Sequence, residues 1–153
     1  MADTISIEAF SQLAGRELAP TPWLEISQVR VNQFADATND HQFIHVDEEK
    51  ARQTPFGGTI AHGFLTLSLL SDMLTDCLPL PEGLVMGINY GSDKVRYLAP
   101  VKVGQRIRAI VKIADVGEKR PGQWLVKSAV TVEIEGESTP ALIAEILSMF
   151  VVE

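Results

Sequence analysis

The spacing of apolar positions divides the chain into a helical first half and a strand-rich second half. In the first half, residues 5–13 and 27–37 show helical spacing, and Ser27 is a favourable helix N-cap. A short strand is predicted between these helices, within residues 20–27, and residues 47–52 predict one further helical turn.

Residues 59–77 form the most distinctive segment. Thr59 is the expected N-cap of a helix here. The apolar residues that follow cover most of the helical circumference and lie at positions 60, 61, 64, 65, 67, 69, 70, 73, 74 and 77. A helix that is apolar on nearly every side is typical of an enclosed helix, so we expect the rest of the chain to wrap around it.

The second half supplies the covering layer. Alternation is clearest where Val126, Ser128, Val130 and Val132 repeat at every second position, and Gly and Pro separate the segments. The predicted strands are residues 84–90, 94–98, 105–115, 123–135 and 139–152. Short turns between long strands favour an antiparallel sheet. The sequence therefore predicts an α+β fold in which an antiparallel β-sheet wraps around a central α-helix, with 1–153 as one domain.

Composition limits the compartment and the partners. The chain has 20 acidic against 13 basic residues and a net charge of −7, which disfavours binding to nucleic acid. Cys77 has no second cysteine to pair with, which fits a reducing compartment, and we expect the cytoplasm. We also expect neither a secretory signal nor a membrane span, because polar residues interrupt every long apolar run.

Titratable residues gather within residues 36–47, where Asp40 and His45 form the strongest candidate pair. Five positions on one continuous helix would separate them by about 140°. Asn39 tolerates the left-handed conformation that ends helices, so the chain can turn there and bring both side chains together. A carboxylate and an imidazole that share a water molecule can activate it. The alternative is that Asp40 caps the turn and His45 is a half-buried structural histidine.

The entrance of the central helix is a second candidate. The first N–H groups of a helix have no partner within it and lie at the positive end of its dipole. Gly63 lacks a Cβ, so a substrate carbonyl can approach its N–H and an oxyanion can be stabilised there. The alternative is that Gly63 only permits close packing and that His62 caps the helix or fills space.

Other chemistries have weaker support. His41, His45, Asp40 and Asp47 do not follow a known metal-ligand spacing, so no metal and no cofactor are expected. Neither a G-x-S-x-G elbow nor a glycine-rich phosphate loop occurs. A basic cluster can face solvent or bind the phosphates of a ligand, and it comprises Lys94, Arg96, Lys102, Arg106, Arg108 and Lys112.

Residues 37–47 and 60–71 resemble the MaoC-like, or (R)-specific, enoyl-CoA hydratases, and residues 89–91 and 95–101 extend the similarity. These proteins have the hot-dog fold, in which a sheet wraps around a central helix. Their motif S-G-D-x-N-P-x-H falls on residues 38–45, with the Asp and His in register.

The resemblance implies roles for individual residues. It makes Asp40 and His45 the acid/base pair that binds water and the Gly63 N–H the donor to the thioester carbonyl. Ser71 matches a serine that lies near the catalytic aspartate. The substrate-binding residues expected besides Ser71 are Phe43, Phe64 and Arg96.

The implied reaction is the reversible addition of water to a trans-2-enoyl-CoA, which gives a (3R)-hydroxyacyl-CoA. The motif departs from the usual pattern at Asn39, Gln42 and Phe43, and glutamine followed by an aromatic residue resembles the NodN-like subgroup. The resemblance leaves open the acyl chain, the choice between CoA and a carrier protein, and which member of the pair is the base.

Two other functions share the expected fold. A non-catalytic module that binds acyl-CoA or acyl-carrier protein does not require the Asp40/His45 pair, and a hot-dog thioesterase would hydrolyse the thioester. The presence of both residues favours hydration. An open sheet edge invites pairing with a second copy, so we expect a homodimer, as the resemblance also implies.

Overall fold

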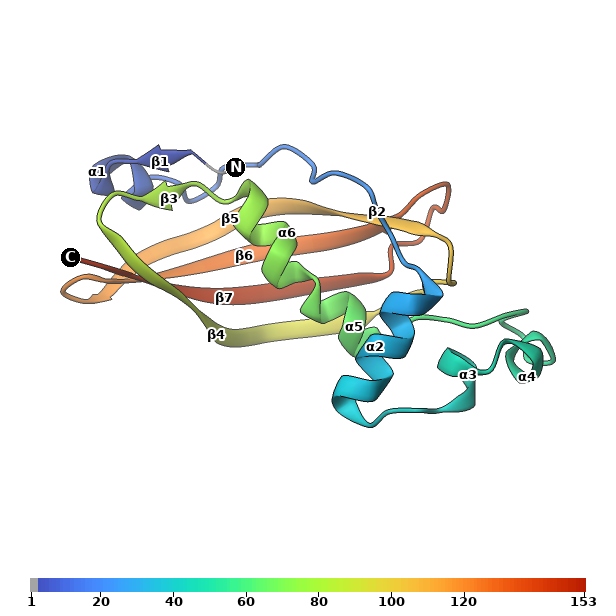
Figure 1. The fold of residues 1–153 in the computed structure, drawn as a ribbon. Coiled ribbons are helices and arrows are strands. Elements are labelled where there is room, and N and C mark those ends of the chain that lie inside the picture. The colour runs from blue at the N-terminus through green and yellow to red at the C-terminus, as the bar shows by residue number, and fades with distance from the viewer. Residues whose placement is uncertain (1–2) are drawn as a thin grey trace.

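The computed structural model describes residues 3–153, so the first two residues of the predicted 1–153 domain lie outside it. Its main feature is a five-stranded antiparallel sheet in the order β2-β5-β6-β7-β4 (Figure 1). The strands are β2 (Leu24–Glu25), β4 (Leu84–Tyr97), β5 (Arg106–Arg120), β6 (Gln123–Ile134) and β7 (Leu142–Val152). Two short strands, β1 (Thr4–Ile5) and β3 (Leu80–Pro81), pair in parallel as a second sheet.

Six short helices accompany the sheets in residues 3–153: α1 (Ile7–Ser11), α2 (Gln28–Thr38), α3 (Phe43–Val46), α4 (Glu48–Arg52), α5 (Gly63–Ser68) and α6 (Leu70–Cys77). Helices α5 and α6 run one after the other across one face of the sheet, and α2, α3 and α4 gather near the start of α5 (Figure 1). The hydroxyl of Ser27 accepts a hydrogen bond from the Arg30 N–H, as expected of the N-cap of α2.

Alternation along β6 explains how the sheet meets the central helix. Its side chains alternate between buried and half-buried positions, so that one face of the strand lies in the core. Leu65, Leu70 and Met73 from α5 and α6 belong to the same cluster as Val126 and Val130. The predicted α+β arrangement of an antiparallel sheet around a central helix is therefore confirmed.

The start of the central helix differs from the prediction. Thr59 is not the N-cap; that position belongs to His62, and the helix begins at Gly63. The preceding residues are extended because their backbone pairs with another segment: the Ala61 N–H donates to the Val101 carbonyl at 2.8 Å, and Ile60 bridges to Lys102. Extended pairing here removes one turn from the predicted helix.

The helix is also less enclosed than its composition predicts. Phe64 of α5 is 70% exposed. Polar residues of α5 and α6 are exposed as well, including Ser68, Ser71 and Asp72. Within this single chain the central helix is therefore partly open. None of the helices in residues 3–153 has both the length and the apolar character needed to cross a membrane.

The two edges of the sheet are unequal. Beside β5, the N-terminal segment covers the strand: the Gly15 N–H donates to the Ile113 carbonyl and the Leu18 N–H to the Val111 carbonyl. At the opposite edge, β4 pairs only with β7 among the described residues. The segments 84–90 and 94–98, predicted as separate strands, form this one strand with shifts of register along it.

Candidate active site

The end of α2 turns the chain as the sequence predicts. Asn39 has φ 59° and ψ 24°, the left-handed conformation that ends the helix, and Asp40 follows directly. The short helix α3 then carries His45. The sequence predicts a loop here, so the turn at Asn39 is confirmed and the helical geometry of residues 43–46 is a difference.

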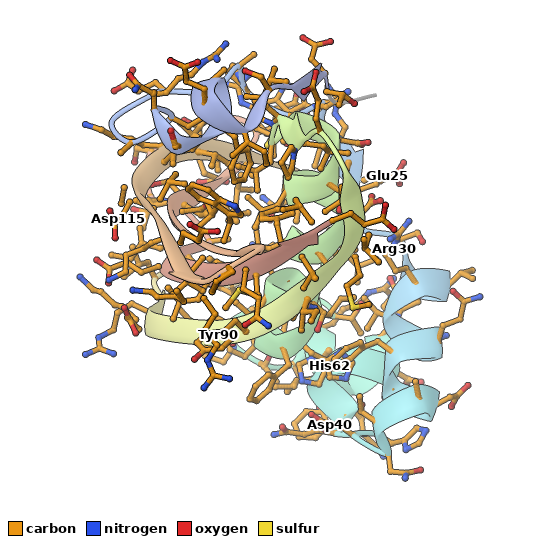
Figure 2. All side chains as sticks on the ribbon, turned by 90° about the vertical axis from the view of Figure 1, so that its left-hand side faces the viewer. Glu25, Arg30, Asp40, His62, Tyr90 and Asp115 are labelled. Carbon is orange, nitrogen blue, oxygen red and sulfur yellow. The ribbon has the colours of Figure 1, made fainter. Side chains whose placement is uncertain are left out.

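This turn brings the candidate pair together. Side-chain ligand atoms of Asp40, His45 and His62 all lie within 4.8 Å of one another. Figure 2 shows Asp40 and His62 on the same side of the molecule, beside α2. Asp40 is exposed, whereas both histidines are buried, so the cluster joins one solvated carboxylate to two imidazoles shielded from water.

The ring of His45 has a defined hydrogen-bonding state. Its Nδ1 lies 2.7 Å from the carbonyl oxygen of Ile60. A carbonyl only accepts, so Nδ1 carries the proton and Nε2 of the neutral ring holds the free lone pair. Burial lowers the pKa of His45 from its ordinary value of 6.5. His45 is therefore a neutral imidazole near pH 7 with a proton acceptor at Nε2.

Gln28 on α2 is a supporting residue that the sequence does not reveal. Its Nε2 donates to the His45 carbonyl at 2.8 Å, and its Oε1 accepts from the Thr59 hydroxyl at 2.6 Å. Its partners are 17 and 31 residues away along the chain, and no local pattern points to them. This amide joins α2, α3 and the segment before α5 around the candidate base.

A pocket of about 440 Å³ opens beside His45. Gly63 and Phe64 at the start of α5 form one side, and Tyr97 closes over Gly63: a Cβ added there would lie 2.9 Å from Cε1 of Tyr97. The first N–H groups of α5 have no partner within the helix. The other lining residues are mainly apolar and comprise Ile60, Ala61, Thr66, Leu98, Ala99, Pro100, Val101 and Ala141.

The expected substrate-binding residues do not all lie at this pocket. Phe64 lines the pocket, whereas Phe43 stands 42% exposed on α3. Ser71 lies in a different groove, where its hydroxyl accepts from Asn89 at 3.3 Å, and it does not join His45 in the pocket wall. Successive residues of a strand point to opposite faces, and the neighbour Tyr97 lines the pocket, so Arg96 lies on the other face of β4.

The geometry of the histidines does not suit a shared metal ion. The rings of His45 and His62 stack at 3.8 Å with 23° between their planes. An imidazole binds a metal through a lone pair in its own ring plane, and one ion cannot lie in two nearly parallel planes this far apart. We therefore derive no chemistry from a metal at this cluster.

Comparison with known proteins places the site in a family context. Residues 9–137 match the family described as MaoC like domain. The chain is 48% identical over 141 residues to nodulation protein N of Rhizobium meliloti, which covers 92% of this chain and 88% of that protein. It is 43% identical over 146 residues to 3-hydroxyacyl-thioester dehydratase Z of Mycobacterium tuberculosis, which covers 95% and 96%.

Solved structures agree with the same family. The unliganded R-hydratase PhaJ1 from Pseudomonas aeruginosa matches with a TM-score of 0.74 and 25% identity, over 94% of this chain and 86% of that one. Relatives and structure together confirm the family and the hot-dog fold that the motif predicts.

Proposed function

This chain belongs to the family of MaoC-like dehydratases, and we propose that it is a hydro-lyase that adds water reversibly to a trans-2-enoyl-CoA, giving a (3R)-hydroxyacyl-CoA. The observation that carries the proposal is the convergence of Asp40 and His45 beside a pocket that also contains Gly63. The name of the thioester dehydratase supports a thioester substrate, and the name of the R-hydratase supports hydration.

Water is activated in the first step. The water molecule donates one hydrogen bond to the exposed carboxylate of Asp40 and the other to Nε2 of His45. His45 takes the proton as the water oxygen bonds to C3 of the substrate. The Ile60 carbonyl keeps the opposite nitrogen protonated, and the negative charge of Asp40 favours the imidazolium that forms. His45 is thus the base of the pair, and Asp40 orients the water.

The electron pair of the double bond moves toward the thioester as the oxygen bonds to C3. Negative charge collects on the carbonyl oxygen, which accepts a hydrogen bond from the Gly63 N–H at the positive end of α5. The imidazolium of His45 then returns its proton to C2. One water molecule is added, its hydroxyl to C3 and its hydrogen to C2, and His45 is again neutral.

The acyl chain is proposed to occupy the apolar part of the pocket. Phe64 forms part of that wall, and Phe43, exposed nearby on α3, supplies a further apolar contact for the substrate. Burial of such rings against an acyl chain removes apolar surface from water. Arg96 faces away from the pocket of its own chain, so any contact with a ligand phosphate is made outside this pocket.

The functional unit is proposed to be a homodimer that pairs through β4. An unpaired strand edge presents N–H and C=O groups to another chain. Large apolar side chains of this strand are also exposed, including Val85, Met86, Ile88 and Tyr90. Figure 2 labels Tyr90 on this strand, at the edge of the sheet. Light scattering should give twice the chain mass of 16.7 kDa.

A matched pair of variants tests the interface. Ile88→Lys places a charge on β4 and should yield monomers, whereas Val29→Lys, at an apolar site on α2 that is even more exposed (66% against 44%), should leave the dimer intact. A wild-type mass of one chain refutes the dimer, and a dimeric Ile88→Lys protein refutes pairing through β4.

The reaction itself is tested with crotonyl-CoA and a longer trans-2-enoyl-CoA, by following loss of enoyl absorbance and release of free thiol in parallel. Asp40→Asn and His45→Gln preserve size and should each lower kcat by about 10²–10⁴-fold, the contribution of general acid–base groups. His41→Gln is the matched control because His41 is an exposed neighbour that pairs with Asp36.

Each outcome separates the candidate functions. The proposal is supported if the protein hydrates the substrate without releasing free thiol and if Asp40→Asn and His45→Gln lose this activity. Thiol release replaces it with a thioesterase. Binding of the thioester without turnover replaces it with a binding module.

A further inference from the structure

His62 is buried to 2% exposure at the N-cap of α5, yet its side chain makes no capping hydrogen bond. The ring instead contacts both members of the candidate pair. Its Nε2 lies 2.9 Å from the backbone carbonyl oxygen of Asp40, and its plane stacks on that of His45 at 3.8 Å. Helix capping therefore does not account for this histidine.

The hydrogen-bonding state of His62 follows from the same reasoning as for His45. The Asp40 carbonyl accepts, so Nε2 carries the proton. Within residues 3–153, Nδ1 is buried and has no hydrogen-bond partner. Buried polar atoms are normally paired, and this exception requires an explanation. A simple packing role would be filled better by an apolar ring than by an imidazole with one unpaired nitrogen.

Few local contacts hold Asp40 in place, so its position depends on the bond from His62. It is exposed and follows a residue in the left-handed conformation. Among the described residues, its carboxylate receives only a long local contact of 3.4 Å from the Gln42 N–H. The bond from His62 ties the Asp40 backbone to a residue 22 positions away, at the start of the central helix.

The ring of His62 also restrains His45, the other member of the pair. His45 is fixed at Nδ1 by the Ile60 carbonyl, and the stacked ring of His62 limits rotation of its plane. Phe34 packs against His62 at 4.9 Å between ring centroids and keeps His62 in place. The next residue along the chain is Gly63, so one residue borders the water-binding pair and the oxyanion donor.

We infer that His62 is a positioning residue, which fixes Asp40 through its backbone carbonyl and His45 through ring stacking and so aligns both for water activation. The inference rests on the proposed function. His62 itself does not exchange a proton with the substrate, because its protonated nitrogen is committed to Asp40. Its contribution is the geometry of the other two groups.

Two substitutions separate the contacts. His62→Phe keeps a flat ring and removes the donor, whereas His62→Gln keeps an N–H donor of similar reach and removes the ring. His62→Phe should lower kcat by about 100-fold with KM nearly unchanged, since a displacement of about 1 Å has this cost. His62→Gln should restore part of that loss, because it keeps a donor to the Asp40 carbonyl but lacks the ring that stacks on His45. Phe10→Leu alters a buried aromatic residue that contacts Trp124 and Phe150 instead of His62, and it is the matched control.

A double-mutant cycle tests whether His62 acts through Asp40. In an Asp40→Asn background, His62→Phe should change kcat by less than about threefold, since two residues that work through one contact are not additive. An equal loss in both backgrounds would overturn the inference, as would a His62→Phe enzyme with wild-type kcat. Thermal unfolding of every variant shows which losses reflect misfolding.

A measurement that does not depend on activity completes the test. In amide NMR spectra, signals of residues 39–42 should shift in His62→Phe and keep their wild-type positions in His62→Gln. Unchanged signals in His62→Phe overturn the positioning role. If wild-type protein hydrates no enoyl-CoA, the proposed function fails by itself, and these spectra still decide whether His62 orders Asp40.

Discussion

Gly63→Ala tests the start of α5 most directly. The added Cβ would lie 2.9, 3.1 and 3.2 Å from three ring carbons of Tyr97, and ordinary contact begins at 3.4 Å. The Tyr97 ring must therefore withdraw by about 0.5 Å, a difference taken from these distances. Tyr97 is 49% exposed, so it can move toward solvent without opening the core.

The fold should survive this change. Alanine is the better helix former by about 0.5–1 kcal/mol, which offsets the displacement of one half-exposed ring. The free energy of unfolding should therefore stay within about 1 kcal/mol of wild type. Catalysis should not survive if Gly63 has the proposed role, because the methyl group would then block the approach of the thioester carbonyl to the N–H. Loss of one oxyanion donor lowers kcat by about 10²–10³-fold.

The assay is kcat for crotonyl-CoA hydration, with urea unfolding of the same samples. Gly58→Ala is the matched control, since its Cβ would meet nothing within 4 Å. The double variant Gly63→Ala/Tyr97→Ala relieves the contact with the ring and, compared with Tyr97→Ala alone, should retain the defect. A Gly63→Ala enzyme with wild-type kcat would refute the oxyanion role. Restoration in the double variant would assign the defect to the displaced ring.

Three further predictions concern the surroundings of the site. Burial lowers the pKa of His45 below 6.5, so the folded protein favours the neutral ring. The neutral base, and its contribution to the stability of the fold, are present above pH 6.5 and are lost as the pH falls through the lowered pKa. A profile of kcat/KM against pH should then have its acid midpoint below 6.5; a midpoint at or above that value contradicts the assignment. Gln28→Leu leaves the His45 carbonyl and the Thr59 hydroxyl unpaired and should cost about 1–3 kcal/mol in urea unfolding. Asn32→Ala removes only an exposed partner of Gln28 and should cost far less; equal losses would refute the role of Gln28 in joining α2, α3 and the segment before α5. Burial raises the pKa of Cys77 to about 11, so native protein at pH 8 should react with iodoacetamide far more slowly than unfolded protein, and equal rates would contradict its burial.

The sequence predicts the features that depend on local pattern. Asn39 ends α2 because few other residues tolerate the left-handed conformation, and Ser27 begins that helix because its hydroxyl accepts from a free N–H. Alternation in β6 identifies its buried face. The same kind of reasoning predicts that Asp40 and His45 lie close together, since their side chains converge only if the helix stops between them.

What the sequence does not predict depends on contacts distant along the chain. Thr59 has the composition of an N-cap, but pairing of Ile60 and Ala61 with residues 101–102 keeps that segment extended. Gln28 and His62 are equally ordinary in their local context, and only their bonds to His45 and Asp40 distinguish them. Arg96 illustrates the same limit, because the side of β4 that it occupies depends on the register with β7.

The open edge strand β4 ends beside the pocket. Tyr97 at the end of β4 and Leu98 just beyond it line the pocket, and both are about half exposed, at 49% and 47%. A second chain paired along β4 would extend the sheet next to these residues and reduce their contact with water. Charge development on a thioester is stabilised more strongly when water is excluded around the donor. In the proposed dimer, pairing along the open edge of β4 would therefore also shield the pocket around His45 and Gly63.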